Sequence, residues 1–498
     1  MQTISSAIAW WANTLPEKLA LSIGADRITY AALRDWSDRI AAHLISLGVA
    51  RGDRVGVCGV NSAEYCALIF GILRVGAVVS PLNVRYTTHE LDELVGDMTP
   101  RIVFADAERR AKFASIAVDV RALEDMRGYM QGARAKLDRE TLPDDAVGII
   151  ATSGSTAKPK GVVYSNRTMT SYSAAWMMEE AVGARDGRVV IPAPLSTSAG
   201  FVNLIHYTVL GFTAYFESAF DPQAFLDILV REKITCFAAA PLFFERIAAL
   251  PSFASADLSA MRCATTGGAS VSRALQDVWA TKGVVLRQIY GQTEAGGNST
   301  IMPAHLAMSA PEKCGRGGIF TQHRIVDEKG DEVAPGTVGQ IIVRGPGLMV
   351  GYWNNPKATA ETLKDGWLYT GDLGVVDEDG LLTFVDRMKD IIISGGLNIS
   401  AAEVERAVAA FEGVEEVMVI AAKDQKFGET PMAVVYASRP IDVASLIAHC
   451  NQRLADYKVP RYVAVEAEPM PRTATGKLSK PTMREKYANA AETLPRVR

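Results

Sequence analysis

The sequence of 498 residues has little cysteine and no long uncharged apolar run. Its six cysteines stand singly, mostly in apolar surroundings such as "VGVCGV", without a C-x-x-C motif or a local histidine cluster. This pattern predicts reduced core cysteines and disfavours a disulfide framework or a cysteine metal site. The start, "MQTISSAIAWWANTLPEK", lacks a basic region followed by a long apolar core. We therefore expect a cytoplasmic protein without integral membrane association.

Positive and negative side chains are nearly balanced. The formal net charge is -4, and lysines and arginines form no basic runs, so nucleic acid is not an expected partner. A hydrophobic content of 48% with 22% charged residues is typical of a globular protein. A chain of this length exceeds what one core holds, so we expect one large domain and at least one small one.

The chain order of apolar patterns predicts an α/β fold. From about residue 40 to 320, strand-like runs such as "RVGVCGV" alternate with helical patterns such as "SAEYCALIFGILRVG", which favours largely parallel sheets. Between about 320 and 387, short strands with hairpin signals at "EKGD" and "DEDG" indicate a β subdomain. We predict a large N-terminal domain, residues 1–388, of two α/β subdomains plus this β subdomain, and a small mobile α+β C-terminal domain, residues 389–498.

Two helix starts have recognisable caps. Ser400 and Glu403 in "SAAEVERAVAAF" have capping-box spacing. Asp221 in "AFD" directly precedes Pro222, which predicts a helix cap there.

The stretch "ATSGSTAKPKGVV", residues 151–163, combines glycine, hydroxyl groups and lysine. It is not a P-loop, because Pro159 stands where that motif has its second glycine and Gly161 where it has Ser or Thr. Its residue types still suit a polyphosphate, since backbone N–H groups, hydroxyls and ammonium groups all favour anions. Taken alone, the stretch fits a polar surface loop equally well.

Four further segments follow in chain order: "IYGQTEAGG", "WLYTGDLG", "DRMKDIIISGGLNIS" and "PRTATGKLSK". With the loop, they resemble the adenylate-forming superfamily, which includes acyl-CoA synthetases, free-standing adenylation enzymes and beetle luciferase. The resemblance spans nearly the whole chain. It implies that a carboxylate attacks the α-phosphate of ATP, and that a thiol then displaces AMP to form a thioester. The implied cofactors and partners are ATP, Mg2+, coenzyme A and a small carboxylic acid, with a homodimer left open.

The resemblance also implies roles for single residues. Lys477, Thr293, Glu294 and Lys160 would be catalytic, with Glu294 binding Mg2+ and Lys477 bridging the carboxylate and the α-phosphate. Without the resemblance, Asp372 would be an ordinary turn residue and Lys477 a solvated lysine. The full nucleotide-binding set is Thr152, Ser153, Gly154, Ser155, Thr156, Lys160, Gly267, Gly268, Ala269, Tyr290, Gly291, Thr293, Asp372, Arg387 and Lys477.

The second half-reaction and the acid also have candidate residues. Lys389 matches the hinge about which the small domain rotates, and Arg85, Gly396 and Phe427 match residues that contact coenzyme A. The expected acyl pocket is apolar, which favours a hydrophobic monocarboxylic acid: aryl, cyclic or fatty. Its candidates are Thr197, Phe201, Val202, Ala239, Gly267 and Gly291, near Trp176 and Ala240.

Several positions depart from the family pattern, among them Ala157 of the loop, where the family usually has glycine. "PLSTSAG" has Ser196 and Thr197 where many relatives have an aromatic residue and a histidine, and Leu397 replaces a glutamate. Either the tunnel mouth is remodelled for a bulky acyl group, which we favour, or the second half-reaction is altered.

The main hypothesis is an ATP-dependent acyl-CoA synthetase. The alternatives are a stand-alone ligase that loads a carrier protein, a nucleotide-binding sensor without catalysis and, more remotely, a luciferase-like oxidase. Glu294, Asp372, Arg387 and Lys477 together argue against the sensor, because a protein without catalysis does not need all four.

Overall fold

The structure is a computed structural model of the chain. It describes residues 2–133, 135, 137, 140–152, 159–180, 182–183, 185–269, 271–472 and 478–498. Within these residues, no helix combines the length and apolar character needed to cross a bilayer.

The first sheet has seven strands in the order β18-β8-β7-β4-β3-β5-β6. Strands β3 to β7 run parallel, whereas β8 returns antiparallel to β7 and β18 pairs antiparallel with β8. Helices α2 and α3 cross closely at Gly71, where an added Cβ would lie 2.4 Å from Ile40 Cγ2. The elements are α2 (Tyr30–Ser46), β3 (Arg54–Cys58), α3 (Ala63–Val75), β4 (Val78–Leu82), α4 (Thr88–Met98), β5 (Ile102–Ala105), β6 (Val120–Ala122), β7 (Ala146–Thr152), β8 (Lys160–Ser165) and β18 (Gly351–Tyr352).

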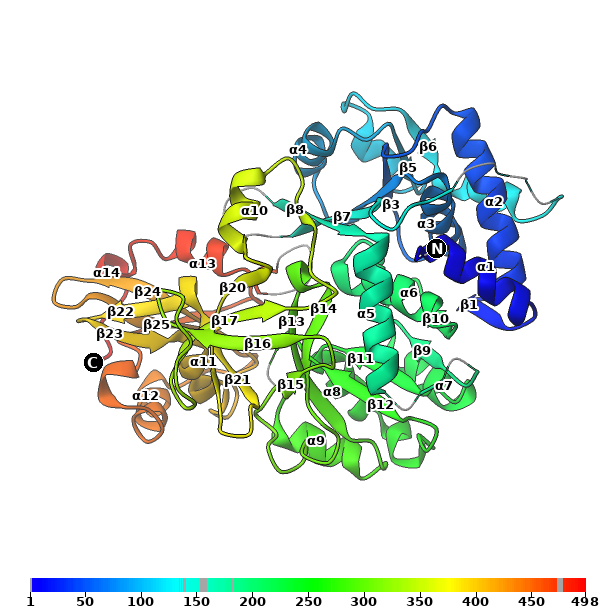
Figure 1. Cartoon of the computed structure of the whole chain (residues 1–498). Coiled ribbons are helices and arrows are strands. Elements are labelled where there is room, and N and C mark those ends of the chain that lie inside the picture. The colour runs from blue at the N-terminus through cyan, green and yellow to red at the C-terminus, as the bar shows by residue number, and fades with distance from the viewer. Residues whose placement is uncertain are drawn as a thin grey trace. The chain divides into compact units, whose positions relative to one another are not determined.

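The second sheet has nine strands in the order β15-β14-β13-β12-β11-β9-β10-β1-β2. Its six central strands, from β13 to β1, are parallel, as the alternating pattern predicts (Figure 1). The strands are β1 (Leu19–Ile23), β2 (Asp26–Thr29), β9 (Arg188–Val190), β10 (Thr213–Phe216), β11 (Cys236–Ala239), β12 (Cys263–Thr266), β13 (Leu286–Gln292), β14 (Gly297–Ile301) and β15 (Arg316–Gly317).

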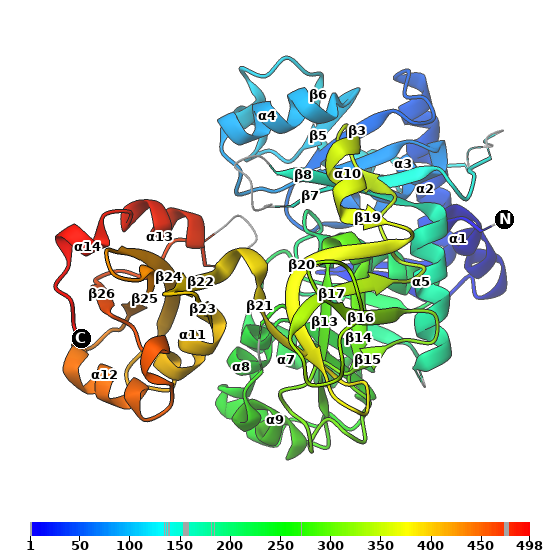
Figure 2. The same ribbon diagram turned by 60° about the vertical axis from the view of Figure 1, so that its left-hand side comes forward.

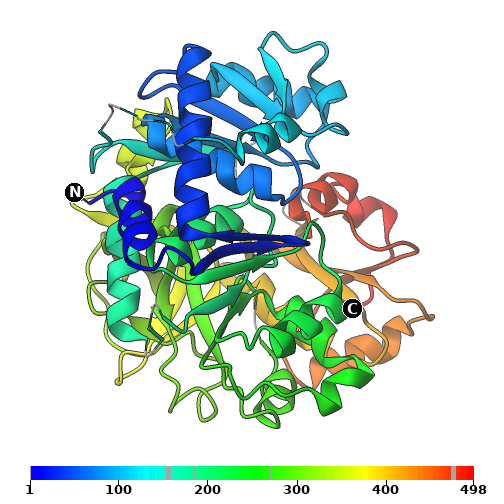
Figure 3. The ribbon, with the colours of Figure 1, turned by 90° about the vertical axis from the view of Figure 1, so that its right-hand side faces the viewer.

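The helices of this region bury large aromatic side chains. Phe225, Phe244 and Trp279, from three successive helices, join Phe237 of β11 in one apolar cluster. At the N-terminus, α1 and α2 lie side by side, both blue in Figure 3. Asp221 caps the helix that begins at Pro222, as predicted. The helices are α1 (Ile4–Thr14), α5 (Asn166–Glu179), α6 (Ser198–Val209), α7 (Pro222–Arg231), α8 (Pro241–Ala248) and α9 (Arg273–Ala280).

The predicted β subdomain is a sheet in the order β16-β17-β20-β19, with β21 alongside β20. Gly380 has φ +74° in the "DEDG" turn that joins β20 to β21, a conformation that favours glycine. The elements are β16 (Gln322–Val326), β17 (Gly339–Arg344), α10 (Pro356–Thr362), β19 (Leu363–Lys364), β20 (Trp367–Val376) and β21 (Leu382–Arg387).

The C-terminal sheet has the order β23-β22-β25-β24, with β26 beside β25. Each face has its own apolar cluster, because alternate residues of β24 and β25 point to opposite sides. Helices α11 and α12 cover one face, and α13 and α14 the other (Figure 2). The elements are β22 (Ile391–Ser394), β23 (Leu397–Ser400), α11 (Ala401–Ala409), β24 (Glu416–Asp424), β25 (Gly428–Tyr436), α12 (Val443–Asn451), β26 (Tyr462–Glu466), α13 (Lys480–Lys486) and α14 (Ala490–Thr493).

The cap of α11 follows only half of the expected pattern. Ser400 accepts a hydrogen bond from the Glu403 backbone N–H, as a capping residue does. The Glu403 carboxylate instead accepts from Lys458 Nζ at 2.7 Å. The Glu403 carboxylate therefore bonds the charged Lys458, which tertiary packing brings near, and not the backbone N–H of Ser400 that a capping box would use.

The chain forms two compact units. One comprises residues 1–324, 342–370 and 378–382, and the other residues 325–341, 371–377 and 383–498. The boundary near Lys389 stays a prediction. All six cysteines are buried, which confirms their expected place in the core.

Candidate active site

Two glycine-containing segments meet at the carboxyl ends of β12 and β13. Gly267 follows β12 and lies against Ile289 of β13, so closely that an added Cβ would be 2.5 Å from Ile289 Cγ1. Gly291 approaches the next strand still more closely, because an added Cβ would lie 2.0 Å from the Gly297 carbonyl oxygen. In α/β proteins, this edge of a parallel sheet is where ligands bind.

Tyr290 directly precedes Gly291 in β13 and is buried, with 6% of its surface exposed. Its backbone N–H donates to Thr300 Oγ1 at 3.2 Å. Between Tyr290 and Gly291 the pairing of β13 with β14 shifts register. Such irregularities redirect side chains at the ends of strands.

A short 3-10 helix, Thr293–Ala295, carries the next two candidates. The Tyr164 hydroxyl donates to the Thr293 carbonyl at 2.5 Å, and burial raises the pKa of Tyr164. Glu294 Oε1 accepts from the Tyr352 hydroxyl at 2.9 Å. Burial, and secondly the Glu294 charge, raise the pKa of Tyr352. Both tyrosines therefore stay neutral hydrogen-bond donors at physiological pH.

The polar loop lies between β7 and β8. Thr152 pairs with Lys160 across these strands, and its Oγ1 donates to the Lys160 carbonyl at 3.2 Å. Lys160 Nζ lies 4.8 Å from the centroid of the Tyr352 ring. Lys160 and Glu294, predicted from separate motifs, thus share Tyr352 as a neighbour. The predicted phosphate-binding residues Ser153, Gly154, Ser155 and Thr156 lie outside the described residues.

Asp372 and Arg387, the candidate ribose pair, lie on neighbouring strands β20 and β21. Arg387 Nε is 3.8 Å from Asp372 Oδ1. Lys389 follows two residues after Arg387. Its pKa is lowered, first by burial and second by the positive charge of Arg387. The adjacent Asp390 accepts a hydrogen bond from Arg484 Nη2 at 2.7 Å. Lys477, the predicted adenylation lysine, lies outside the described residues.

The acyl-pocket candidates come from α6 and β11. Phe201 is fully buried, and its ring covers Gly148 of β7, where an added Cβ would be 2.7 Å from the ring. Ala239 ends β11 and pairs with Thr266, directly before Gly267. Thr197 caps α6: its Oγ1 accepts from the Gly200 N–H at 3.2 Å and donates to the Pro194 carbonyl at 2.8 Å. The Thr197 hydroxyl is thus engaged by the protein backbone.

Two of the three coenzyme A candidates are close in space. Gly396 lies in the turn between β22 and β23, and the preceding Gly395 donates its N–H to the Phe427 carbonyl at 2.8 Å. The Arg461 guanidinium lies 4.1 Å from the centroid of the Phe427 ring. Arg85, the third candidate, is exposed in the other compact unit.

Two residues near the candidates were not predicted from sequence. One is Tyr352. The other is His206 of α6, whose Nδ1 is 3.1 Å from Ser173 Oγ and whose pKa burial lowers to about 3. No local motif marks either residue, because their partners are distant in sequence.

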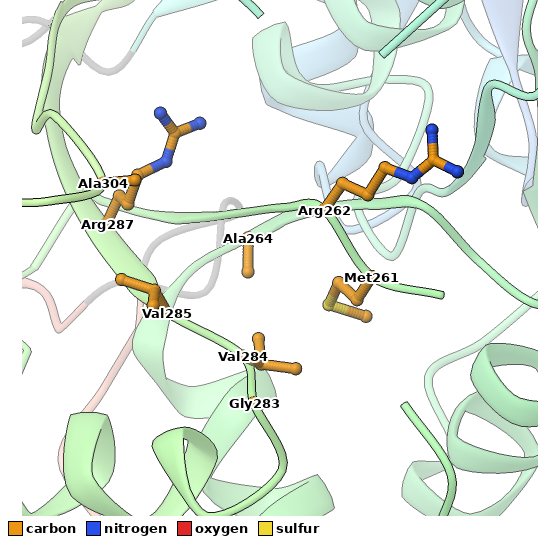
Figure 4. Close-up of a pocket in the computed structure, with 8 residues that line it drawn as sticks. All are labelled: Met261, Arg262, Ala264, Gly283, Val284, Val285, Arg287 and Ala304. Carbon is orange, nitrogen blue, oxygen red and sulfur yellow. The ribbon is translucent and has the colours of Figure 1, made fainter. Parts of the chain in front are cut away.

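A cavity of about 110 Å³ lies at the amino ends of β12 and β13, the opposite edge from the candidate site. Apolar side chains face its middle, while the guanidinium groups of Arg262 and Arg287 extend away from them (Figure 4). Arg287 Nη2 pairs with Glu180 Oε1 at 2.7 Å. No predicted site residue that the structure describes lines this cavity, whose lining is Met261, Arg262, Ala264, Gly283, Val284, Val285, Arg287 and Ala304.

The expected metal can be tested against these donors. Among the described residues, no three His, Cys, Asp or Glu side chains form a set able to hold a metal by themselves. Glu294 offers a single half-buried carboxylate. That donor fits Mg2+, which is commonly bound by one or two carboxylates together with substrate phosphates and water.

Comparison with known families decides between the alternatives. A model described as "AMP-binding enzyme" matches residues 8–353, and one described as "AMP-binding enzyme C-terminal domain" matches residues 403–477. The chain belongs to the AMP-binding enzyme family. The predicted membership of the adenylate-forming superfamily is thereby confirmed.

Individual members of the AMP-binding enzyme family match over almost their full length. A feruloyl-CoA synthase from Amycolatopsis sp is 37% identical, over 96% of this chain and 97% of that protein. The long-chain-fatty-acid–CoA ligase FadD13 of Mycobacterium tuberculosis is 33% identical, over 93% of both chains. The solved structure of O-succinylbenzoate coenzyme A synthetase (MenE) from Bacillus subtilis, in complex with ATP and magnesium ion, is 27% identical. Its TM-score is 0.88, with 95% of this chain and 98% of that chain covered.

These likenesses confirm the fold class, with its large N-terminal and small C-terminal parts. They also confirm the predicted enzyme class, an AMP-forming acid–thiol ligase of the acyl-CoA synthetase type. The carrier-loading and non-catalytic alternatives are not favoured.

Proposed function

We propose that this enzyme activates a hydrophobic monocarboxylic acid, ring-bearing or fatty, as an acyl-adenylate and transfers the acyl group to coenzyme A. The observation that carries the proposal is the convergence of Lys160, Thr293 and Glu294 at the carboxyl edge of the sheets. These residues come from two separate motifs, and Tyr352 contacts both Lys160 and Glu294. An ammonium group and a metal-binding carboxylate that contact the same tyrosine suit a nucleoside triphosphate with its cation.

In the first half-reaction, a carboxylate oxygen attacks the α-phosphorus and pyrophosphate leaves. Lys160 and Thr152 would bind the departing phosphates, and Thr293 would donate to the α-phosphate. Magnesium, held by Glu294 and the phosphates, would supply positive charge that reduces repulsion between the two anions. Asp372, oriented by Arg387 at 3.8 Å, would accept the ribose hydroxyls. Fixing both reactants can supply about 7 to 11 kcal/mol of the barrier reduction.

The choice of acid rests on the chemistry of the candidate pocket. Phe201 and Val202 are buried, and Ala239 adds a small apolar wall beside Gly267. A charged group on the substrate would have no partner among these side chains, so its burial would be unfavourable. The feruloyl and long-chain fatty acid relatives agree with an apolar pocket.

In the second half-reaction, the thiol of coenzyme A attacks the acyl carbonyl and AMP leaves. We propose that the C-terminal domain, residues 389–498, rotates about Lys389 between the half-reactions. Lys477 would serve adenylation, and Gly396 and Phe427 would serve thioester formation. The neighbouring positions of Gly396 and Phe427 support the proposal, since one face of the domain then carries both.

The test is a screen of carboxylic acids. ATP–pyrophosphate exchange reports the adenylate, and AMP release with and without coenzyme A reports transfer. We expect exchange with hydrophobic acids and faster AMP release when coenzyme A is present. Binding of ATP without exchange for any acid would contradict the proposal. If the acyl group were transferred only to a phosphopantetheinylated carrier protein, the acceptor would be that carrier and not coenzyme A.

A further inference from the structure

A short segment, residues 347–353, joins the two parts of the candidate phosphate site through its backbone. The Val350 N–H donates to the Val163 carbonyl at 2.8 Å, and the Trp353 N–H donates to the Gly161 carbonyl at 2.7 Å. At the other end, the Met349 N–H donates to the Glu294 carbonyl at 2.9 Å. The segment is therefore bonded both to β8, which carries Lys160, and to the short helix that carries Glu294.

Segment 347–353 and the Glu294 helix approach each other closely at Gly296. Gly296, two residues after Glu294, has φ +75°. A Cβ added there would lie 2.0 Å from the Gly347 carbonyl oxygen. Only glycine fits at this position, so the backbones of segment 347–353 and the Glu294 helix approach closely enough for the Met349–Glu294 hydrogen bond, which places Tyr352 near the carboxylate.

The Tyr352 side chain makes contacts with both its hydroxyl and its ring. Its hydroxyl donates to Glu294 Oε1 at 2.9 Å, and Thr362 is a second hydrogen-bonding neighbour of that hydroxyl. Lys160 Nζ lies 4.8 Å from the ring centroid, within the range of a cation–π interaction. One side chain therefore contacts both a proposed metal ligand and a proposed phosphate-binding cation.

We propose that Tyr352 is a positioning residue of the adenylation site, whose hydroxyl orients the Glu294 carboxylate toward the Mg2+ of MgATP and whose ring holds Lys160 toward the phosphates. The inference rests on the proposed roles of Glu294 and Lys160. The hydroxyl occupies one lone pair of Oε1 and limits rotation of the carboxylate. The other oxygen stays available to the cation, and little side-chain entropy is lost when it binds.

The two roles can be separated by substitution. Tyr352→Phe removes the hydroxyl and keeps the ring under Lys160. We expect MgATP binding about tenfold weaker, the lower end of the loss in metal affinity that typically follows removal of a group orienting a metal ligand. Binding of ATP in EDTA should change less than about twofold. Tyr352→Leu also removes the ring, and should weaken ATP binding in EDTA by about two- to fivefold, the size of an exposed cation–π contact.

The measurement is isothermal titration calorimetry of the full-length protein with MgATP and with ATP in EDTA. Tyr215→Phe is the matched control, because the Tyr215 hydroxyl also contacts a glutamate, Glu232, at 3.1 Å and belongs to the same compact unit. It should leave both affinities unchanged. In pyrophosphate exchange, Tyr352→Phe should raise the Mg2+ concentration giving half-maximal rate, and saturating Mg2+ should restore most of the rate.

Two results would overturn the inference: unchanged affinities in Tyr352→Phe, or equal losses with and without Mg2+. Glu294→Gln gives a second measurement. In that background Tyr352→Phe should cause no further loss of MgATP affinity, and a full additional loss would also overturn the inference. A wild-type protein that binds MgATP no better than ATP in EDTA would instead contradict the proposed function itself.

Discussion

The contact between Gly148 and Phe201 allows a sharp test of the acyl pocket. In Gly148→Ala, the added Cβ would lie 2.7 Å from ring atoms Cε1 and Cζ of Phe201. Normal carbon contacts need about 3.5 to 4.0 Å, so the ring has to move by about 1 Å. Phe201 is fully buried, so this movement disturbs neighbouring side chains.

The loss in the free energy of unfolding can be estimated from substitutions in packed protein cores. Overpacking by one methyl group typically costs about 1 to 3 kcal/mol, and the lower backbone entropy of alanine in the unfolded chain returns about 0.4 to 1 kcal/mol. We expect a net loss of about 1 to 2 kcal/mol in the free energy of unfolding. The displaced ring should also raise KM for bulky acids and leave KM for MgATP unchanged.

The assay combines urea unfolding, followed by tryptophan fluorescence, with pyrophosphate exchange over acids of graded width. Gly96→Ala in α4 is the control, since its Cβ would meet no atom within 4 Å. It should stabilise the protein by up to about 1 kcal/mol. The double variant Gly148→Ala/Phe201→Leu should lose less stability than the two single losses added together. Strict additivity, or an unchanged acid profile in Gly148→Ala, would refute the reasoning.

Two further predictions concern protonation and the tail. Burial lowers the pKa of His206 from its ordinary 6.5 to about 3. The free energy of unfolding is therefore highest above pH 6.5, where His206 is neutral in both states, and it decreases as the pH falls toward 3. The unfolded chain then binds the extra proton, which predicts a loss of about 1.4 kcal/mol between about pH 7.5 and 5.5. Urea unfolding at both pH values should show this loss in the wild type and its absence in His206→Gln; an identical slope in both proteins would count against it. Lys477→Ala should abolish pyrophosphate exchange and keep thioester formation from synthetic acyl-adenylate, as followed by release of AMP. Equal loss of both activities would show that Lys477 is not specific to adenylation.

Much of the fold follows from local sequence pattern. The alternation of strand-like and helical runs indicates parallel sheets because buried parallel strands are apolar on both faces. The capping role of Asp221 follows from its position before Pro222, since both residue types favour a helix start. At Ser400 the same logic predicts the cap and fails for Glu403, because Lys458 is brought near by tertiary packing.

The candidate site shows the same limit. Motif order identifies Lys160 and Glu294, but each motif alone says nothing about which side chain lies between them. Tyr352 is 58 residues from Glu294 along the chain. The pairing of β18 with β8 and the Met349–Glu294 backbone hydrogen bond bring it there. The engagement of Thr197 in capping α6 was likewise outside what the motif comparison predicts.

The attachment of α13 limits how residue 477 can travel. Lys480 Nζ lies 2.9 Å from Glu405 Oε1 and 3.8 Å from Asp390, and Arg484 of the same helix also bonds Asp390. Residue 477 is three positions from this anchored lysine, so its Cα stays within about 11 Å of it even with the chain fully extended. A large displacement of residue 477 therefore requires α13 and the residues bonded to it to move as well. Substitutions that remove the ion pairs with Asp390 and Glu405 should increase the range over which residue 477 can move.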